Sequence, residues 1–440
     1  MLINDIITKI RSLLSANSSG KKIHARLIKV GKGYARTSVN TSIFRKSSLA
    51  THGSTQYIAY YDGDGNIVLG KRNLGSRHWS LVTLPYKGKV ADAHNVISIG
   101  VDGNGFIHMA FDMHGHPLKY TKSTKSGSLE MMSLQSTDGV EDESVTYPEF
   151  YSLPDGDLLL AYRSGRSGNG SMVLKKYTTA SKQWHTLHNN LIDGQLQRNA
   201  YWQMIVDAKG RIHLSWVWRE TADVATNHDV CYAWSDDGGI SWKKTDGSTY
   251  ALPITIENAE VAWQVPQNVE LINQTSIAAD SEGHPYIATY WRDLDSEVPQ
   301  YRTVMHDGTM WRSYQVGERK IPFSLKGKGT KMVPISRPCI LIDNSLIYYI
   351  FRDIERGSRI SVAITDNIDK GFQKIIDIST VSVDAWEPTL DINLWNKSKK
   401  LHLFVQATHQ GDGEKLSSHD KKNSIVYVME LITNHSDNTL

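Results

Sequence analysis

Imidazole, phenol and guanidinium side chains recur in consecutive segments of this 440-residue sequence. His94 and His114 stand in one segment, and Tyr147 and Arg163 stand in the next. Imidazole and phenol groups transfer protons when their neighbours tune the pKa, and a guanidinium binds both oxygens of a carboxylate. No pair of carboxylic acids accompanies these residues, so the pattern is unlike ordinary glycoside hydrolysis.

This set of groups suits β-elimination from a uronic acid, in which a base removes the C5 proton and the group on C4 departs. The ionised carboxylate makes the C5 proton only weakly acidic, so a cation must stabilise the enolate-like intermediate. We expect Arg163 to neutralise the carboxylate. Tyr147 and His114 are the candidate base and acid, in an order that depends on the stereochemistry at C5. His94 is expected on the carboxylate or on the departing oxygen.

A repeated unit must position these residues. It consists of a short apolar strand, a turn with Asp or Gly, an aromatic-rich second strand and one or two further strands. Its turn aspartates are 53, 52, 73 and 63 residues apart, at Asp102, Asp155, Asp207, Asp280 and Asp343. A first copy at residues 56–62 and a last copy at residues 391–406 bring the count to seven. The sequence therefore predicts an all-β fold, a seven-bladed β-propeller.

Local signals support this organisation. The segment SDDGGISW at residues 235–242 matches the Asp-box, a hairpin turn at the outer edge of propeller blades. No linker divides the repeats, so we expect one propeller domain over residues 25–440. Apolar residues recur at helical spacing near the N-terminus, which predicts a helical leader over residues 1–24.

Blade topology predicts which side chains meet. The start of strand one and the end of strand two lie at the same end of a blade, where loops of several blades converge around the axis. The residues at such positions are His94, His114, Tyr147, Arg163, Tyr201, Arg219, Arg292, Arg337 and Arg352. We expect substrate to be bound by Tyr201, Arg219, Arg292, Asn95 and His116. His108 and His213 lie within strands and are expected to be core residues with hydrogen-bond partners.

Composition limits the classes of function. Hydrophobic residues make up 40% and charged residues 22%, as in folded globular chains, and a net charge of +3 does not favour nucleic-acid binding. No apolar run is long enough for a transmembrane helix, and no export signal is recognisable. Cys231 and Cys339 could pair, bind a metal or pack in the core, of which the last is commonest. We expect a monomer without nucleic-acid or membrane partners.

Several stretches resemble the BNR-repeat polysaccharide lyases, particularly the seven-bladed ulvan lyases: DAHNVISIGVDGNGFIHMAFDMHGHPLKY, TYPEF, LLLAYRSGRSGNG, RNAYWQ, GRIHLSWVWRE, NHDVCYAWSDDGGISW and ISRP. The resemblance covers residues 40–406. It implies β-elimination of sulfated algal ulvan, between 3-sulfated rhamnose and glucuronate or iduronate, to give unsaturated uronate ends. The lyase site it implies comprises His94, His114, Tyr147, Arg163 and Tyr201.

The resemblance also bears on cofactors and location. It implies no cofactor for the chemistry but a structural zinc, for which His228 and Cys231 offer the local His-x-x-Cys spacing. It implies an anionic polysaccharide or oligosaccharide as partner, and secretion or a periplasmic location.

Three alternatives remain open on the same scaffold. A hydrolase that removes rhamnose from glucuronate would use the opposite face, where His52 is expected. A sialidase would carry several Asp-boxes and a carboxylic acid beside its tyrosine. A non-catalytic sugar-binding propeller would expose aromatic platforms, such as Trp202, Trp218 and Trp291.

Overall fold

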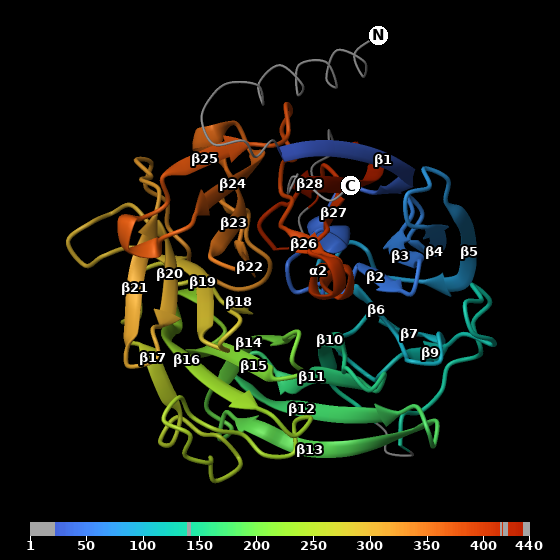
Figure 1. Cartoon of the computed structure of the whole chain (residues 1–440), viewed down its shortest axis with the longest axis horizontal. Helices are drawn as coiled ribbons and strands as arrows, with labels where there is room; N and C mark the ends of the chain where they lie inside the picture. Colours follow the sequence, from blue (N-terminus) through green and yellow to red (C-terminus); the bar gives the residue numbers. More distant parts are fainter. Residues whose placement is uncertain (1–22, 139–141, 414–415, 417–420, 434–440) are drawn as a thin grey trace, which may run out of the picture.

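The strands form seven antiparallel sheets, arranged as blades around a central axis (Figure 1). The structure, a computed structural model, describes residues 23–138, 142–413, 416 and 421–433. The chain is therefore a seven-bladed β-propeller, as the repeat count predicts.

One blade joins the two ends of the described chain. Its outer strand β1 (Ile23–Tyr34) pairs with β28 (Asn423–Thr433). Strand β28 pairs in turn with β27 (Leu401–Val405), and β27 pairs with β26 (Thr389–Leu390). Strand β1 thus begins inside the segment assigned to a leader, and residues 1–22 of the predicted leader helix lie outside the described residues. Pairing of β1 with β28 closes the ring.

Four blades are regular four-stranded meanders. Their strands are β2 (Leu49–His52), β3 (Thr55–Tyr61), β4 (Asn66–Asn73) and β5 (Ser80–Lys87); β14 (Asn199–Val206), β15 (Ile212–Arg219), β16 (Asn227–Ser235) and β17 (Glu260–Trp263); β18 (Ser276–Ala279), β19 (Pro285–Trp291), β20 (Gln300–His306) and β21 (Trp311–Val316); β22 (Cys339–Asp343), β23 (Leu346–Asp353), β24 (Arg359–Thr365) and β25 (Lys374–Asp377).

In the remaining two blades, a short strand from the segment of one blade joins the sheet of the next. The first contains β6 (Ile97–Val101), β7 (Ile107–Phe111) and β9 (Tyr120–Lys122), and the second contains β10 (Val145–Ser152), β11 (Leu158–Arg166), β12 (Asn169–Thr178) and β13 (Gln183–Asp193). The short strand β8 (His114–His116) lies between β7 and β9 in sequence but pairs with β10, where His114 is opposite Thr146. The pairing of β8 with β10 brings His114 next to the part of β10 that carries Tyr147.

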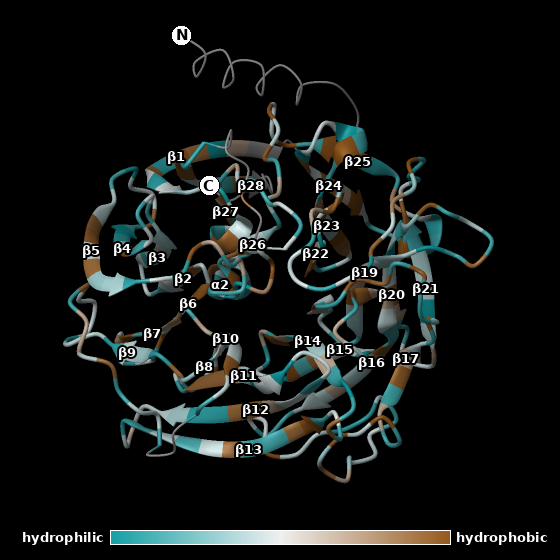
Figure 2. Cartoon of the chain, turned by 180° about the vertical axis from the view of Figure 1, so that it is seen from behind, coloured by the Kyte–Doolittle hydropathy of each residue, from teal (hydrophilic) through white to brown (hydrophobic). Residues whose placement is uncertain are grey.

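Short helices connect these strands: η1 (Ser38–Asn40), η2 (Val224–Thr226), η3 (Ile354–Arg356), η4 (Ile368–Lys370) and α2 (Ile392–Ser398). Helix α2 lies near the centre of the ring in both views (Figures 1 and 2). No helix among the described residues is long and apolar enough to cross a membrane.

The turn aspartates hold the hairpins between first and second strands. Asp102 accepts hydrogen bonds from the backbone N–H groups of Asn104 and Phe106, at 2.9 Å each. Asp207 and Asp280 make the same pair of bonds two and four residues further on. The side chain thus replaces a backbone acceptor in the turn, which is why aspartate recurs there.

The Asp-box forms the turn that the sequence predicts. Asp237 accepts bonds from the backbone N–H groups of Ile240 and Ser241, at 3.0 Å each. Trp242 is fully buried and donates through Nε1 to the carbonyl of Gly239 at 3.1 Å. The Asp-box follows β16 and leads to the outer strand of its blade.

The core lies between adjacent blades. One cluster packs Leu159 of β11 against Met204 of β14 and Trp216 of β15. Cys231 and Cys339 are both buried and unpaired, so they pack in the core. The predicted core histidines have partners: Nδ1 of His108 lies 2.8 Å from the Tyr120 hydroxyl, and Nδ1 of His213 lies 2.8 Å from the Tyr232 hydroxyl.

Candidate functional site

A cavity of about 260 Å³ collects the chemistry-bearing side chains of three successive blades and two arginines of the blade β22–β25. The loop before β6 contributes His94, the next blade contributes His114 through its added strand β8, and β14 and β15 complete the set. The sequence-predicted residues that line this cavity are His94, His114, Tyr147, Arg163, Tyr201, Arg219, Arg337 and Arg352.

The four rings form a continuous row. The centroids of His94 and His114 are 4.1 Å apart, those of His94 and Tyr147 are 5.9 Å apart, and those of Tyr147 and Tyr201 are 6.2 Å apart. Phe44 packs against His94 and Tyr147 from the segment after η1, at 5.4 and 5.1 Å. Neighbouring groups of the row are thus close enough to act on one bound sugar unit.

A distortion in β10 places Tyr147. Its backbone adopts a φ of 58°, in the left-handed region that a bulky residue rarely occupies. The pairing of β10 with β11 shifts register between Thr146 and Glu149, which marks a bulge around this residue. Bulges re-aim side chains, and strained backbone concentrates at functional sites.

The guanidinium groups of Arg163 and Arg219 line the cavity and share the Tyr201 hydroxyl. Arg163 donates to the hydroxyls of Thr146 and Tyr201, at 3.1 and 3.5 Å, and Arg219 donates to Tyr201 at 3.4 Å. Among the described residues, neither is ion-paired to a carboxylate, whereas Arg337 is paired with Glu387. The cavity therefore carries positive charge that an anionic ligand can balance.

The two phenols differ in proton affinity. Burial raises the pKa of Tyr147 well above its usual value, and the adjacent Tyr201 raises it further. Burial acts in the same direction on Tyr201, but Arg219 and Arg163 outweigh it and bring the pKa of Tyr201 below its usual value. Tyr147 therefore holds its proton more tightly than Tyr201 does.

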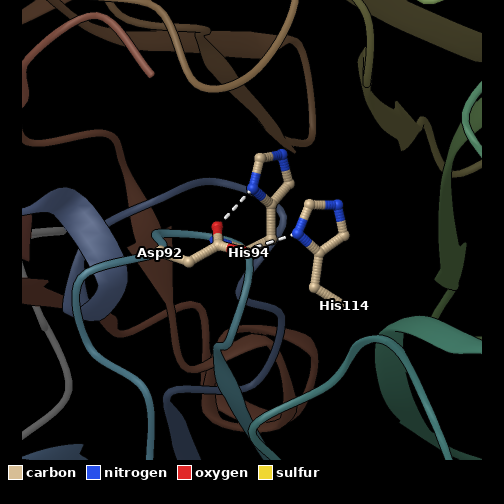
Figure 3. Close-up of side chains that lie close together, drawn as sticks. All are labelled: Asp92, His94 and His114. Carbon is tan, nitrogen blue, oxygen red and sulfur yellow. Dashed lines mark hydrogen bonds and ion pairs between the residues drawn. The ribbon is translucent and has the colours of Figure 1, made fainter. Parts of the chain in front are cut away.

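Asp92 holds the two imidazoles. His94 and His114 each donate from Nδ1 to a different oxygen of its carboxylate, both at 2.6 Å (Figure 3). Burial lowers the pKa of His94 to about 4, although Asp92 acts in the opposite direction. His94 is therefore neutral at pH 7. We did not predict Asp92 from the sequence; its signal was an acidic residue two positions before His94.

One wall of the cavity comes from a distant loop, which we call the strap (residues 326–332, between β21 and β22). The backbone N–H of Gly327 donates to Asp223 at 2.7 Å, and that of Met332 donates to Asp412 at 2.9 Å. The strap thus joins the β15–β16 loop to the last blade, and it adds two lysines to the lining, Lys328 and Lys331.

Three predicted substrate-binding residues lie outside this cavity lining: Asn95, His116 and Arg292. Arg292 is paired with Glu270 at 2.6 Å, so its charge is already balanced. Asn95 is buried and donates to the carbonyl of Lys89 at 3.0 Å. His116 lies on β8 with Nε2 3.4 Å from the Lys89 ammonium.

His228 and Cys231 do not fit a zinc site. Both nitrogens of His228 are bound by carboxylates, Nε2 by Glu220 at 2.9 Å and Nδ1 by Asp229 at 3.0 Å. Cys231 is fully buried in the core beside Trp216, and burial raises the pKa of its thiol, which opposes the thiolate that zinc requires. In the described part of the chain they belong to no group of three candidate ligands.

Comparison with known proteins places the chain in a family. The model of the BNR repeat-containing family matches residues 55–319. The chain belongs to this BNR repeat-containing family. The matched residues run from β3 to the loop after β21.

Curated relatives are ulvan lyases. The long-isoform ulvan lyase of Pseudoalteromonas sp. (strain PLSV) is 24% identical over 317 residues, which cover 56% of this chain and 32% of that protein. The short-isoform ulvan lyase of Alteromonas sp. (strain LOR) is 22% identical over 324 residues, covering 56% and 61%. The chain thus matches about a third of the long isoform and less than two thirds of the short one.

Solved structures share the architecture. The crystal structure of the polysaccharide lyase Uly1 matches with a TM-score of 0.64 and 15% identity, over 96% of this chain and 95% of that one. A PL25 ulvan lyase bound to -[GlcA(1-4)Rha3S]- matches with a TM-score of 0.65 and 14% identity, over 90% and 95%. At this identity the likeness establishes the fold.

Proposed function

We propose that this BNR repeat-containing protein is a polysaccharide lyase that cleaves a sulfated, ulvan-type uronate polymer by β-elimination. The observation that carries the proposal is the pair of guanidinium groups, Arg163 and Arg219, that face a row of phenols and imidazoles without an ion-pair partner among the described residues. Such a cavity offers a carboxylate its counterion and proton-transfer groups on the same sugar. The names of the relatives support the same substrate class.

The reaction needs a base, an acid and a cation. The base takes the C5 proton, and the electron pair of that C–H bond becomes the C4–C5 double bond. The C4–O bond breaks, and the departing oxygen takes a proton from the acid. Arg163 stabilises the enolate-like charge that develops on the carboxylate, because its fork binds both oxygens.

We assign the roles from the surroundings of each group. Tyr147 retains its proton at neutral pH and donates it to the departing oxygen. His114, the more exposed imidazole of the pair, accepts the C5 proton through Nε2, because its Nδ1 is held by Asp92. Neutral His94, whose Nδ1–H is held by Asp92, presents its Nε2 lone pair to a hydroxyl group of the sugar, and Tyr201 anchors Arg163 and Arg219.

A hydrolase is a weaker interpretation because the acids beside the cavity are committed. Asp92 accepts from two imidazoles, and Glu387 is bound by Arg337 and by the backbone N–H of Ile43 at 2.8 Å. Inverting and retaining hydrolases both need two carboxyl groups that flank the scissile bond. A second cavity, of about 320 Å³, opens among the turns at the other ends of the blades, but its lining does not include His52.

A purely sugar-binding propeller is also disfavoured. The proposed aromatic platforms are buried rather than exposed: Trp202 is 4% exposed, Trp218 is 1% exposed and Trp291 is 5% exposed. These three residues pack in the core between blades and do not provide the exposed platforms that this alternative requires.

The test is incubation of the purified protein with ulvan, with a non-sulfated polyuronate and with a neutral polysaccharide. We expect ultraviolet absorbance from the conjugated unsaturated uronate to rise with ulvan, in step with new reducing ends. New reducing ends without this absorbance would mean hydrolysis, and binding without either signal would mean a lectin. Both outcomes contradict the proposal.

A further inference from the structure

One carboxylate serves two imidazoles from different strands. The Asp92 carboxylate binds both stacked rings from one side, with Oδ1 on Nδ1 of His94 and Oδ2 on Nδ1 of His114 (Figure 3). The backbone N–H of His94 also donates to Oδ1, at 2.9 Å. All three side chains are at least partly buried, with exposed fractions of 15% for Asp92, 13% for His94 and 34% for His114.

This arrangement fixes the tautomer of both rings. An ionised carboxylate can only accept hydrogen bonds, so each Nδ1 must carry its proton. In a neutral imidazole Nε2 then has a free lone pair. Figure 3 shows the Nε2 atom of each ring on the side away from Asp92. Asp92 therefore orients two proton acceptors, the Nε2 atoms of His94 and His114.

The carboxylate remains ionised in this position. Burial works against ionisation, but the hydrogen bonds from His114 and His94 outweigh it and hold the pKa of Asp92 below its usual value. A neutral amide of the same shape could accept from only one of the two imidazoles, because its second terminal atom is a donor.

We propose that Asp92 is a positioning residue of the lyase site, which fixes His94 and His114 as paired Nε2 acceptors against the substrate. Its effect on turnover rests on the proposed function, whereas the tautomers do not. Neither Nε2 needs a metal for this role.

The same three residues form the one group of at least three candidate metal ligands within the described residues. Tetrahedral ligands about 2.0 Å from one zinc ion are roughly 3.3 Å from each other. The Nδ1 and carboxylate oxygen atoms are closer than that, at 2.6 Å, which is the length of a charge-assisted hydrogen bond. The geometry is that of a proton shared between two atoms.

The first test needs no substrate. Long-range proton–nitrogen NMR spectra of protein labelled with ¹⁵N-histidine report which nitrogen carries the proton, and His94→Gln and His114→Gln assign the signals. We expect Nδ1–H tautomers for both residues near pH 7.5, and an Nε2–H tautomer for one of them in Asp92→Asn. An Nε2–H tautomer of either residue in the wild type would overturn the proposal, as would stoichiometric zinc binding that Asp92→Asn abolishes in calorimetry with zinc chloride alone.

The second test is kinetic. Asp92→Asn should lower kcat on ulvan on the order of 10²-fold or more, because one ring presents the wrong nitrogen, with KM changed less than about threefold. Asp280→Asn is the matched control: it removes a carboxylate that binds Nδ1 of His284 at 3.0 Å on a turn at the other ends of the blades. An unchanged kcat in Asp92→Asn would overturn the positioning role.

The two tests separate the claims. Wild-type protein that shows both Nδ1–H tautomers but eliminates no uronate polymer would contradict the proposed function and support the anchoring by Asp92. Protein that cleaves ulvan by β-elimination but shows an Nε2–H tautomer for His94 or His114 would support the proposed function and contradict the anchoring by Asp92.

Discussion

Nη1 of Arg163 lies 3.5 Å from the hydroxyl oxygen of Tyr201, although the two residues belong to adjacent blades. Arg219 donates to the same hydroxyl at 3.4 Å. This contact couples the cation that should neutralise a uronate to the phenol whose pKa is lowered. The Tyr201 hydroxyl thus holds the Arg163 guanidinium in place without neutralising its charge, as a carboxylate would.

Arg163→Ala should lower kcat/KM on ulvan by about 10²- to 10³-fold, since it removes the group that stabilises the developing negative charge. Arg163→Lys should recover part of the loss, because it keeps the charge but not the fork. Initial rates of absorbance increase measure both. The control variant is Arg312→Ala. Arg312 is an exposed residue of β21 that is paired with Asp307, and we expect this variant to cleave ulvan at the wild-type rate. A wild-type rate in Arg163→Ala would refute the neutralising role.

Tyr147→Phe removes one oxygen atom and its proton while leaving the ring contacts with Phe44 and His94 in place. We expect kcat to fall on the order of 10²-fold or more, as for loss of a general acid, with little change in the melting temperature. Steady-state kinetics and a thermal melt check the two halves. Turnover at the wild-type level would remove Tyr147 from the proton transfers.

His114→Ala should likewise cost on the order of 10²-fold or more in kcat, because it deletes the proposed base. The ring it removes is one-third exposed, so free imidazole can enter the space. We therefore expect added imidazole to restore part of the rate in this variant and none in Tyr147→Phe. Equal responses of the two variants to imidazole would contradict the assignment.

A buried carboxyl away from the cavity gives the fold a pH dependence. Glu149 is 1% exposed and accepts from the Tyr151 hydroxyl, and burial raises its pKa to about 7 despite Lys46. In the unfolded chain its pKa is about 4.3. Between about pH 4.3 and pH 7 the folded state therefore binds more protons at Glu149 than the unfolded state does. The contribution of Glu149 to stability therefore falls as the pH rises from about 4.3 through 7.

Glu149→Gln removes this titration. We expect the unfolding free energy of the variant, relative to wild type, to increase by about 1–3 kcal/mol between pH 5 and pH 8. Urea unfolding at the two pH values measures it. A difference between the two proteins that does not vary with pH would show that Glu149 titrates normally.

Much of the ring was predictable because repeats act locally. Asp102, Asp207 and Asp280 bind backbone groups two and four residues away, so local sequence marks the turn of each repeated unit. The rule for strand ends then placed Tyr147 and Arg163 at one cavity, because it depends only on blade topology.

The remainder depended on contacts between distant segments. The strap reaches the cavity through bonds to Asp223 and Asp412, which no local pattern indicates. Arg292 lies at the expected strand end but forms an ion pair with Glu270. The partners of His228 are likewise carboxylates, Glu220 and Asp229, so the His-x-x-Cys spacing alone was misleading.

The central claim is that bond cleavage proceeds by proton abstraction without addition of water. Digestion of ulvan in water enriched in the heavy oxygen isotope, followed by mass spectrometry of the oligosaccharides, tests it most directly. The account predicts unsaturated uronate ends and no heavy oxygen in either product beyond the slow exchange at reducing ends, which finished oligosaccharides incubated in the same water measure. One heavy oxygen gained per broken bond would mean hydrolysis and would contradict the account.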